Sequence, residues 1–329
     1  MTAPVHEREL WFLGPKRIEL RAGKSLGPLA YDEVKARALH SGVSQGTELL
    51  LYRGEGPHAF DPSLDSPGAP IYPRRYGYAW VGEITESRAE DVKPGQRIFA
   101  LEPHGDVHCL RRGKWWAIPA DIPSTRATLL PNMETAVNAV WDAGVSLGDV
   151  VVVLGGGVVG LMIALLAQKA GAAEVRLIEP SSLRRQAARN LGVERALPPD
   201  LDEPHAEADV VIEATGNPAC LDNAILHAGH ESTIVVVSFY GERRSPISLG
   251  SDFHRRRLQI KSSQVSRLPA HQRARWDSTR RLAEAARHLR DDRLDRVIGA
   301  PLSFEYAPAI YARLDADPGA ALHTVFSYR

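Results

Sequence analysis

One stretch, from Val150 to Glu179, constrains the fold of this chain more than any other. It begins with a continuous apolar run of β-branched residues, which is typical of a strand buried on both faces of a sheet. Three glycines follow in the spacing G-x-G-x-x-G, and they are Gly155, Gly157 and Gly160. A helical pattern then leads to a second short strand that ends at Glu179. This alternation predicts an α/β fold built on a parallel sheet.

Each glycine in this stretch has a physical role. The first permits a tight turn out of the strand, the second lets the backbone approach a pyrophosphate, and the third lets helix and strand pack closely. Val158 and Val159 stand at the start of the helix, where unpaired N–H groups and a partial positive charge favour phosphate. The stretch therefore predicts dinucleotide binding. The alternative is a tight strand-to-helix turn that binds nothing.

An acid at the end of the second strand bears on the choice of cofactor. Glu179 lies where a carboxylate accepts hydrogen bonds from an adenosine ribose. Because a carboxylate also repels a 2′-phosphate, we expect NAD(H) to be preferred over NADP(H). Arg184 lies just beyond this acid, where it could meet a 2′-phosphate or face solvent on the next helix.

Length and charge limit the class of protein. A chain of 329 residues should hold about two domains. Its net charge of zero gives no reason to expect a nucleic-acid partner. Residues 1–7 lack the pattern of a signal peptide, no apolar stretch is long enough to span a membrane, and only Cys109 and Cys220 are present. We therefore expect a cytoplasmic protein with no membrane partner.

The chain before the glycine motif has a different character. Short strand patterns separated by Gly and Pro turns continue to about Pro131, which predicts a β-rich domain like a partly closed barrel. Within it, residues 41–48 read as a polar, glycine-punctuated loop that feeds a short helix.

Several motifs together carry a resemblance to a known superfamily. The turn at residues 92–98 resembles the pattern V-x-x-x-x-x-G-D-R-V, and residues 134–136 with 143–149 resemble the approach to a cofactor strand. Residues 209–216 resemble a later strand that ends beside a nicotinamide ribose. Over nearly its whole length, the chain resembles the medium-chain dehydrogenase/reductase superfamily, which includes zinc alcohol dehydrogenases and quinone reductases.

This resemblance implies an architecture and a set of cofactor contacts. A GroES-like catalytic domain would cover residues 1–132, a Rossmann dinucleotide-binding domain residues 133–267, and a return to the catalytic domain residues 268–329. The active site would lie in the cleft between the domains. Two copies would pair through the last Rossmann strand, near residues 258–261, to form a homodimer. Further cofactor contacts would come from Thr135, Thr215, Gly216, Ser238 and Phe239.

The chain departs from zinc-dependent members at the metal sites. Where those members have a Cys, a His and a third Cys or acid, this sequence has Ser44, Tyr78 and Pro131. These residues do not replace the thiolate and imidazole ligands of zinc, and the region that carries four structural cysteines in some members has only Cys109. We therefore expect no zinc. A cluster of ligand-type side chains could rebuild a metal site or could simply be a polar loop, which we favour: His104, Asp106, His108 and Cys109.

Four residues are candidates for the chemistry. Thr47 and Glu48 match a hydroxyl and an acid that handle protons or ligand contacts in zinc members, or they cap the short helix. Tyr78 could face the substrate or be a packed aromatic residue. His104 follows a strand and is expected to line the cleft. Arg255–Arg257 resemble a phosphate site but are more typical of a solvated face or a guarded strand edge.

These features lead to a functional hypothesis. We expect a zinc-independent, NAD(P)(H)-dependent oxidoreductase that interconverts an alcohol and a ketone or aldehyde on a biosynthetic small molecule. Residues 41–48 resemble a subgroup that includes bacteriochlorophyllide dehydrogenases. A zinc-free enoyl or quinone reductase and a non-catalytic dinucleotide-binding protein are the alternatives.

Overall fold

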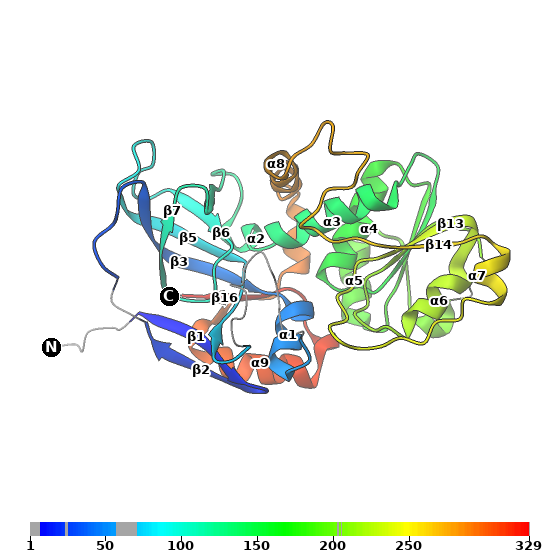
Figure 1. Ribbon diagram of the computed structural model, residues 1–329, viewed down its shortest axis with the longest axis horizontal. Coiled ribbons are helices and arrows are strands. Elements are labelled where there is room, and N and C mark those ends of the chain that lie inside the picture. Colours follow the sequence, from blue (N-terminus) through cyan, green and yellow to red (C-terminus); the bar gives the residue numbers. More distant parts are fainter. Residues whose placement is uncertain (1–6, 24–25, 57–70, 203, 205, 329) are drawn as a thin grey trace. The chain divides into compact units, whose positions relative to one another are not determined.

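The computed structural model describes residues 7–23, 26–56, 71–202, 204 and 206–328, and the chain divides into two units (Figure 1). The first unit comprises residues 1–131 and 298–329, and the second comprises residues 132–297. The second unit extends beyond residue 267, the end of the dinucleotide-binding domain that the resemblance implies. The reason is α8 (Ser278–His288), whose buried Arg281 pairs with Glu134 of the same unit at 3.0 Å.

The second unit is built on a six-stranded sheet in which every neighbouring pair is parallel. Its strand order is β11-β10-β9-β12-β13-β14, which is the doubly wound order of dinucleotide-binding folds. The order reverses between β9 and β12, so their carboxyl ends form the switch point where such folds bind ligands. The strands are β9 (Val150–Leu154), β10 (Glu174–Ile178), β11 (Arg195–Leu197), β12 (Ala208–Glu213), β13 (Ala228–Val236) and β14 (Gln259–Ser262). The predicted α/β class is confirmed.

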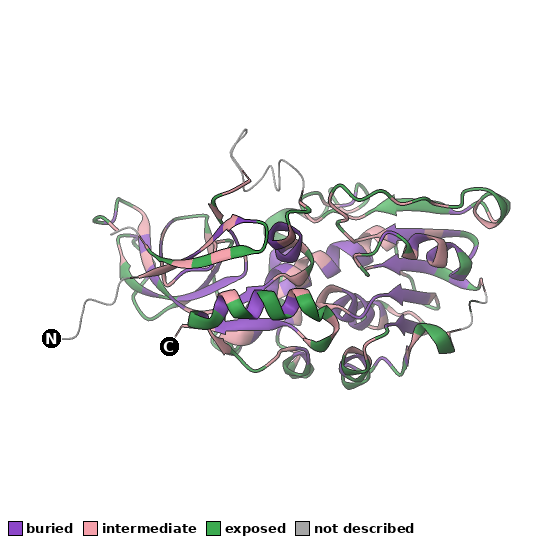
Figure 2. Ribbon diagram, turned by 90° about the horizontal axis from the view of Figure 1, so that it is seen from below, coloured by how far each residue is buried: buried purple, intermediate pink, exposed green. Residues whose placement is uncertain are grey.

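Helices cover this sheet, and Figure 2 shows its strands coloured as buried over much of their length. Besides α8, the helices of this unit are α3 (Leu130–Ala143), α4 (Val158–Ala170), α5 (Ser182–Asn190), α6 (Cys220–His227), α7 (Ser251–Arg255) and the short turns η1 (Pro199–Leu201) and η2 (Asp292–Val297). Helix α4 ends at Gly171, whose φ of +105° and N–H bond back to Ala167 form a C-cap that favours glycine. The predicted strand–helix–strand unit is therefore present.

The first unit is β-rich, as the sequence predicts. A seven-stranded sheet has the order β15-β16-β3-β5-β6-β8, with β7 paired to β3, and a smaller sheet has the order β2-β1-β4. The strands are β1 (Arg8–Gly14), β2 (Arg17–Ala22), β3 (Glu33–Val43), β4 (Arg74–Arg75), β5 (Trp80–Ser87), β6 (Arg97–Ala100), β7 (Val107–Arg111), β8 (Trp115–Ala117), β15 (Leu302–Ser303) and β16 (Thr324–Ser327). Its helices are α1 (Gln45–Arg53), α2 (Ser124–Ala127), α9 (Ala307–Ala316) and the short turns η3 (Phe304–Tyr306) and η4 (Pro318–Ala320).

The C-terminal segment completes the first unit. Strand β16 runs antiparallel to β3, with Val325 opposite Gly42 and Ser327 opposite His40. This pairing extends β3 to Val43, so the expectation of a polar loop over residues 41–48 is wrong. Helix α1 instead begins at Gln45, directly after the strand. No helix in the described part of the chain is long and apolar enough to cross a membrane.

Candidate functional site

Helix α1 carries a fully buried acid. The side chain of Glu48 is 0% exposed, and its Oε1 accepts the backbone N–H of Ser44 at 2.7 Å. Its Oε2 lies 3.0 Å from Nε2 of His104 and also accepts the phenol of Tyr311. Burial and the adjacent carboxylate raise the pKa of Tyr311 well above its usual value, so this phenol stays protonated as a donor. Glu48 therefore reaches back to Ser44, the residue before its helix.

His104 lies in the interior of the first unit. Its side chain is 1% exposed, its Nδ1 lies 2.6 Å from Ser41 Oγ, and its ring meets Phe326 edge-on. The expectation that it lines a cleft is therefore not met. The turn at Gly77 makes this position possible, because a Cβ at that residue would lie 2.8 Å from the imidazole.

Three hydroxyl groups meet at the start of α1. Tyr78 donates a hydrogen bond to Ser44 Oγ, and its own hydroxyl lies 3.4 Å from Thr47 Oγ1. All three side chains are only partly buried, so a ligand can reach them. The cluster offers hydrogen-bond donors to an oxygen atom, but it holds no thiolate, imidazole or carboxylate.

The described residues do not fit a zinc site. The three positions that the resemblance matches to zinc ligands hold the hydroxyls of Ser44 and Tyr78 and the side chain of Pro131, which has no ligand atom. Within the described ranges, no three His, Cys, Asp or Glu side chains gather where they could hold one ion.

The loop cluster of ligand-type residues is dispersed rather than gathered. Asp106 pairs with Arg8 at 2.9 Å, and His108 donates to the carbonyl of Pro103 at 2.9 Å. Burial lowers the pKa of His108 to about 4, and its ring packs on Trp80 with centroids 5.0 Å apart. Both histidines of the cluster are buried, and His108 and Cys109 lie in strand β7, so the favoured expectation of a polar loop with solvated histidines is wrong.

In the second unit, the glycine motif forms a cradle at the switch point of the sheet. Gly155 has φ +99°, and a Cβ there would lie 2.7 Å from the carbonyl oxygen of Ala214, which follows β12. A Cβ at Gly160 would lie 1.9 Å from the carbonyl oxygen of Gly155. A Cβ at Gly157, by contrast, would have no neighbouring atom within 4 Å. The cradle therefore fits the pyrophosphate of a dinucleotide, with partly exposed Val158 and Val159 in the first turn of α4.

Glu179 lies directly against this cradle. Its Oε2 accepts the N–H of Gly156 at 2.7 Å, and its Oε1 accepts the N–H of Ser181 at 2.7 Å. These two bonds fix the carboxylate, which is buried beside the glycine turn. Nη1 of Arg184 lies 4.0 Å from Oε2, so the arginine is beside the acid rather than facing away from it.

A third segment follows β12 at the same edge of the sheet. Thr215 donates through its N–H to Oε1 of Glu213 at 2.7 Å, while Tyr240 donates to Oε2 at 2.5 Å. Burial, followed by the contact with Glu213, raises the pKa of Tyr240. Ser238 accepts the N–H of Gly216 at 2.8 Å, which holds the two loops together. Thr215 and Gly216 are thereby positioned beside the glycine cradle.

The remaining candidates have varied surroundings. Thr135 is half-buried in α3, and Phe239 is 47% exposed beside Ser238. In the arginine run, Arg256 donates to the carbonyls of Ile225 and Ala228 at the end of α6, at 3.2 and 3.1 Å. This arginine therefore caps a helix, and the neighbouring Arg257 pairs with Glu231 at 2.8 Å on the surface.

Comparisons with known proteins agree with this architecture. The model of the zinc-binding dehydrogenase family matches residues 158–284. D-guloside 3-dehydrogenase of Escherichia coli is 27% identical over 284 residues, 78% of this chain and 81% of that protein. The 2-desacetyl-2-hydroxyethyl bacteriochlorophyllide A dehydrogenase of Cereibacter sphaeroides is 27% identical over 250 residues, 70% of this chain and 73% of that protein. The chain belongs to the medium-chain dehydrogenase/reductase superfamily. The crystal structure of L-idonate 5-dehydrogenase from Escherichia coli has the same fold, with a TM-score of 0.80 at 13% identity, covering 98% of this chain and 99% of that one.

As a member of this superfamily, the protein is an oxidoreductase with an NAD(P)-binding dehydrogenase fold. The family match begins at residue 158 and so does not include Ser44, Tyr78 or Pro131. The family match therefore does not bear on metal binding at those three positions.

Sequence reasoning missed several residues that the structure adds to these sites. In the second unit, Glu213 and Tyr240 support the loop after β12. Of the two, only Glu213 is marked in the sequence, as an acid at the end of an apolar strand. In the first unit, Ser41, Tyr311 and Tyr328 join Glu48 and His104 from distant parts of the chain. No local pattern marks them.

Proposed function

We propose that this protein is a zinc-independent, NAD(P)(H)-dependent dehydrogenase that interconverts an alcohol and a ketone. The observation that carries the proposal is the hydroxyl cluster of Tyr78, Ser44 and Thr47, two of which stand at positions that the resemblance matches to zinc ligands. The second unit supports the cofactor part of the proposal through the open space at Gly157 and the fixed carboxylate of Glu179.

The bound nicotinamide would supply or accept the hydride. During ketone reduction the carbonyl π bond breaks, the carbon receives the hydride and the oxygen takes a proton. Negative charge therefore develops on that oxygen, and donors aimed at it stabilise the transition state. Tyr78 is the proposed main donor, because its phenol is partly exposed beside Ser44 and Thr47. Its one proton, which points to Ser44 Oγ in the free protein, would turn to the substrate oxygen, and the Ser44 hydroxyl would then donate to the phenol oxygen.

The substrate is proposed to be a carbinol or ketone on a molecule larger than ethanol. The names of the two relatives point this way, since one is a guloside dehydrogenase and the other acts on a bacteriochlorophyllide. For the cofactor we propose NAD(H), because Glu179 stands beside the cradle and is held by two backbone N–H groups.

The decisive experiment is a hydride-transfer assay. Purified protein is incubated with NAD⁺ and a panel of methyl glycosides and cyclic alcohols, and the formation of NADH and the ketone product is followed. A ketone formed in step with NADH supports the proposal. Reduction of enones or quinones alone would replace it with a reductase of that kind, and tight cofactor binding without any turnover would favour a non-catalytic binder.

A further inference from the structure

A chain of hydrogen bonds crosses the first unit from a surface pocket to the buried acid of α1. The hydroxyl of Tyr328 lies 2.6 Å from Ser41 Oγ, which in turn lies 2.6 Å from Nδ1 of His104. On the other side of the ring, Nε2 lies 3.0 Å from Oε2 of Glu48. The first and last residues are 280 positions apart, and β16 brings them together by pairing with β3.

The partners of Glu48 set the direction of the bonds. Two groups besides the imidazole reach the carboxylate, the N–H of Ser44 and the phenol of Tyr311, and both donate. We take Glu48 as a carboxylate and His104 as a neutral imidazole, and in that pair Nε2 carries the proton that faces the acid. Nδ1 of a neutral imidazole is then an acceptor.

The remaining links follow from that tautomer. Ser41 has to donate its hydroxyl proton to Nδ1 of His104, and it can then only accept from the phenol of Tyr328. Burial raises the pKa of Tyr328, which keeps this phenol protonated as a donor. Every proton in the chain therefore points toward Glu48, and such an alignment strengthens each bond in a poorly solvated interior.

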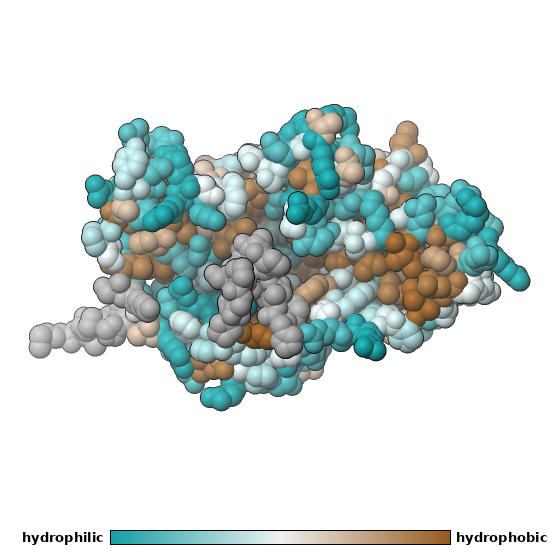
Figure 3. All heavy atoms as spheres, viewed as in Figure 1, coloured by the Kyte–Doolittle hydropathy of each residue, from teal (hydrophilic) through white to brown (hydrophobic). Residues whose placement is uncertain are grey.

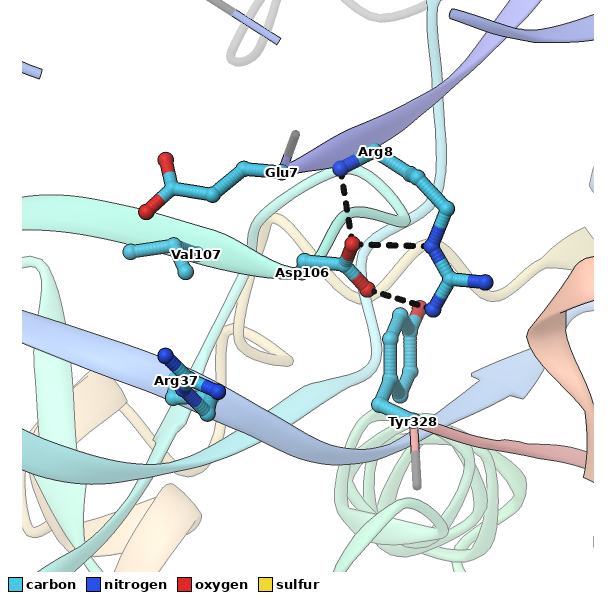
Figure 4. Close-up of a pocket in the computed structure, with 6 residues that line it drawn as sticks. All are labelled: Glu7, Arg8, Arg37, Asp106, Val107 and Tyr328. Carbon is cyan, nitrogen blue, oxygen red and sulfur yellow. Dashed lines mark hydrogen bonds and ion pairs between the residues drawn. The ribbon is translucent and has the colours of Figure 1, made fainter. Parts of the chain in front are cut away.

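The outer end of the chain opens at a small pocket (Figure 4). Tyr328 lines it together with Arg8 and Asp106, which form a two-pronged pair with bonds of 2.9 and 3.0 Å. The inner end meets the candidate active site, because Glu48 holds the N–H of Ser44 and the Ser44 hydroxyl accepts from Tyr78. Glu48 itself is buried and does not reach a ligand.

We propose that Glu48 and His104 are positioning residues: the aligned chain Tyr328–Ser41–His104–Glu48 fixes the start of α1 and thereby the Ser44 hydroxyl that holds Tyr78. The assignment of Tyr78 as donor to the substrate rests on the proposed function, whereas the chain itself does not. Glu48 sets the direction of the hydrogen bonds in this chain, because a carboxylate is the only one of the four groups that cannot donate a proton.

The test is NMR of the full-length protein labelled with ¹⁵N-histidine and ¹³Cζ-tyrosine, without cofactor or substrate. In the native protein we expect His104 as the Nε2–H tautomer. In Glu48→Gln the amide N–H₂ can donate to Nε2, so we expect the tautomer ratio of His104 to reverse toward Nδ1–H. In Glu48→Ala the Ser44 N–H loses its acceptor, and we expect the Cζ resonance of Tyr78 to shift.

Two further variants complete the experiment. Tyr72→Phe is the matched control, because Tyr72 donates to the carbonyl of Leu51 near the other end of α1 and should leave both resonances in place. Ser41→Ala serves if a Glu48 variant does not fold. It should move the Nδ1 resonance of His104 toward that of an unbonded nitrogen and keep the proton on Nε2.

An unchanged tautomer in Glu48→Gln, or an unchanged Nδ1 resonance in Ser41→Ala, would overturn the aligned chain. A Tyr78 resonance that does not move in Glu48→Ala would overturn the positioning role. Because no turnover is measured, failure of the dehydrogenase assay would leave these results intact, and the reverse also holds.

Discussion

The imidazole of His104 occupies the space that a side chain at Gly77 would need. A Cβ at that position would lie 2.8 Å from the ring carbon and 2.9 Å from Nε2, and the residue has φ +122°. The tight turn before Tyr78 and the buried histidine are therefore two parts of one arrangement.

Gly77→Ala should destabilise the first unit through both effects. A left-handed backbone conformation at a non-glycine residue costs about 1–3 kcal/mol, and displacement of the imidazole adds to it. The free energy of unfolding in urea measures the sum. Gly95→Ala is the control, because Gly95 has φ +88° and no neighbour within 4 Å. Equal losses in the two variants would mean that His104 does not restrict residue 77.

Tyr78→Phe should lower kcat more than it raises KM. Phenylalanine keeps the packing against Tyr76 but cannot donate to the substrate oxygen, and loss of one such donor typically costs about 10²–10³ in rate. Steady-state kinetics with the alcohol found in the panel checks this. Tyr72→Phe removes a phenol of the same unit and should keep full activity. Full activity of Tyr78→Phe would remove this tyrosine from the mechanism.

Removal of metal ions should change neither the stability nor the activity of the protein. Because Ser44, Tyr78 and Pro131 cannot replace zinc ligands, we expect well below one zinc per chain by elemental analysis. Treatment with a strong chelator should change neither Tm nor turnover. Stoichiometric zinc that resists dialysis would refute the metal-free proposal.

NADH should bind more tightly than NADPH. The fixed carboxylate of Glu179 favours a ribose diol and repels a 2′-phosphate, whereas Arg184 at 4.0 Å acts weakly in the other direction. Fluorescence titration gives the Kd for NADPH and the Kd for NADH. Glu179→Gln should reduce the ratio of the first to the second. Glu174→Gln, at the other end of β10, is the control and should leave it unchanged. Tighter binding of NADPH by the native protein would mean that the arginine dominates.

The protein should be a dimer that pairs through β14. Among the described strands, only β13 is hydrogen-bonded to β14, the residues of β14 are exposed, and Ile260 is 37% exposed. An edge of this kind is a template for pairing, and Figure 3 shows apolar surface on the unit that carries it. Ile260→Arg should yield monomers in light scattering. Leu249→Arg, which changes another exposed apolar residue of the unit, should not. A native monomer at micromolar concentration would contradict this prediction.

The sequence revealed local features better than distant ones. The unit from Val150 to Glu179 could be predicted because a buried strand, a glycine turn and a helix each leave a pattern within a few residues. The spacing also placed Glu179 at the end of β10, where the structure has it.

The network around Glu48 could not be predicted in this way. Ser41 and Tyr328 meet only because β3 pairs with β16, and Tyr311 reaches Glu48 only because α9 packs against α1. Register and packing between such distant segments depend on the whole core, not on the neighbours of any one residue. The same pairing explains why residues 41–43 are a strand despite their polar, glycine-containing sequence.

The pairing of β16 with β3 also sets the order in which the protein can be completed on the ribosome. Residues 132–297 form one continuous segment and can fold as soon as they emerge. The barrel that begins the chain must wait for its last strand, because β16 ends at Ser327. Until then residues 40–43 of β3 lack their partner strand and Glu48 lacks the phenol of Tyr311, so the barrel starts before the second unit and is finished after it.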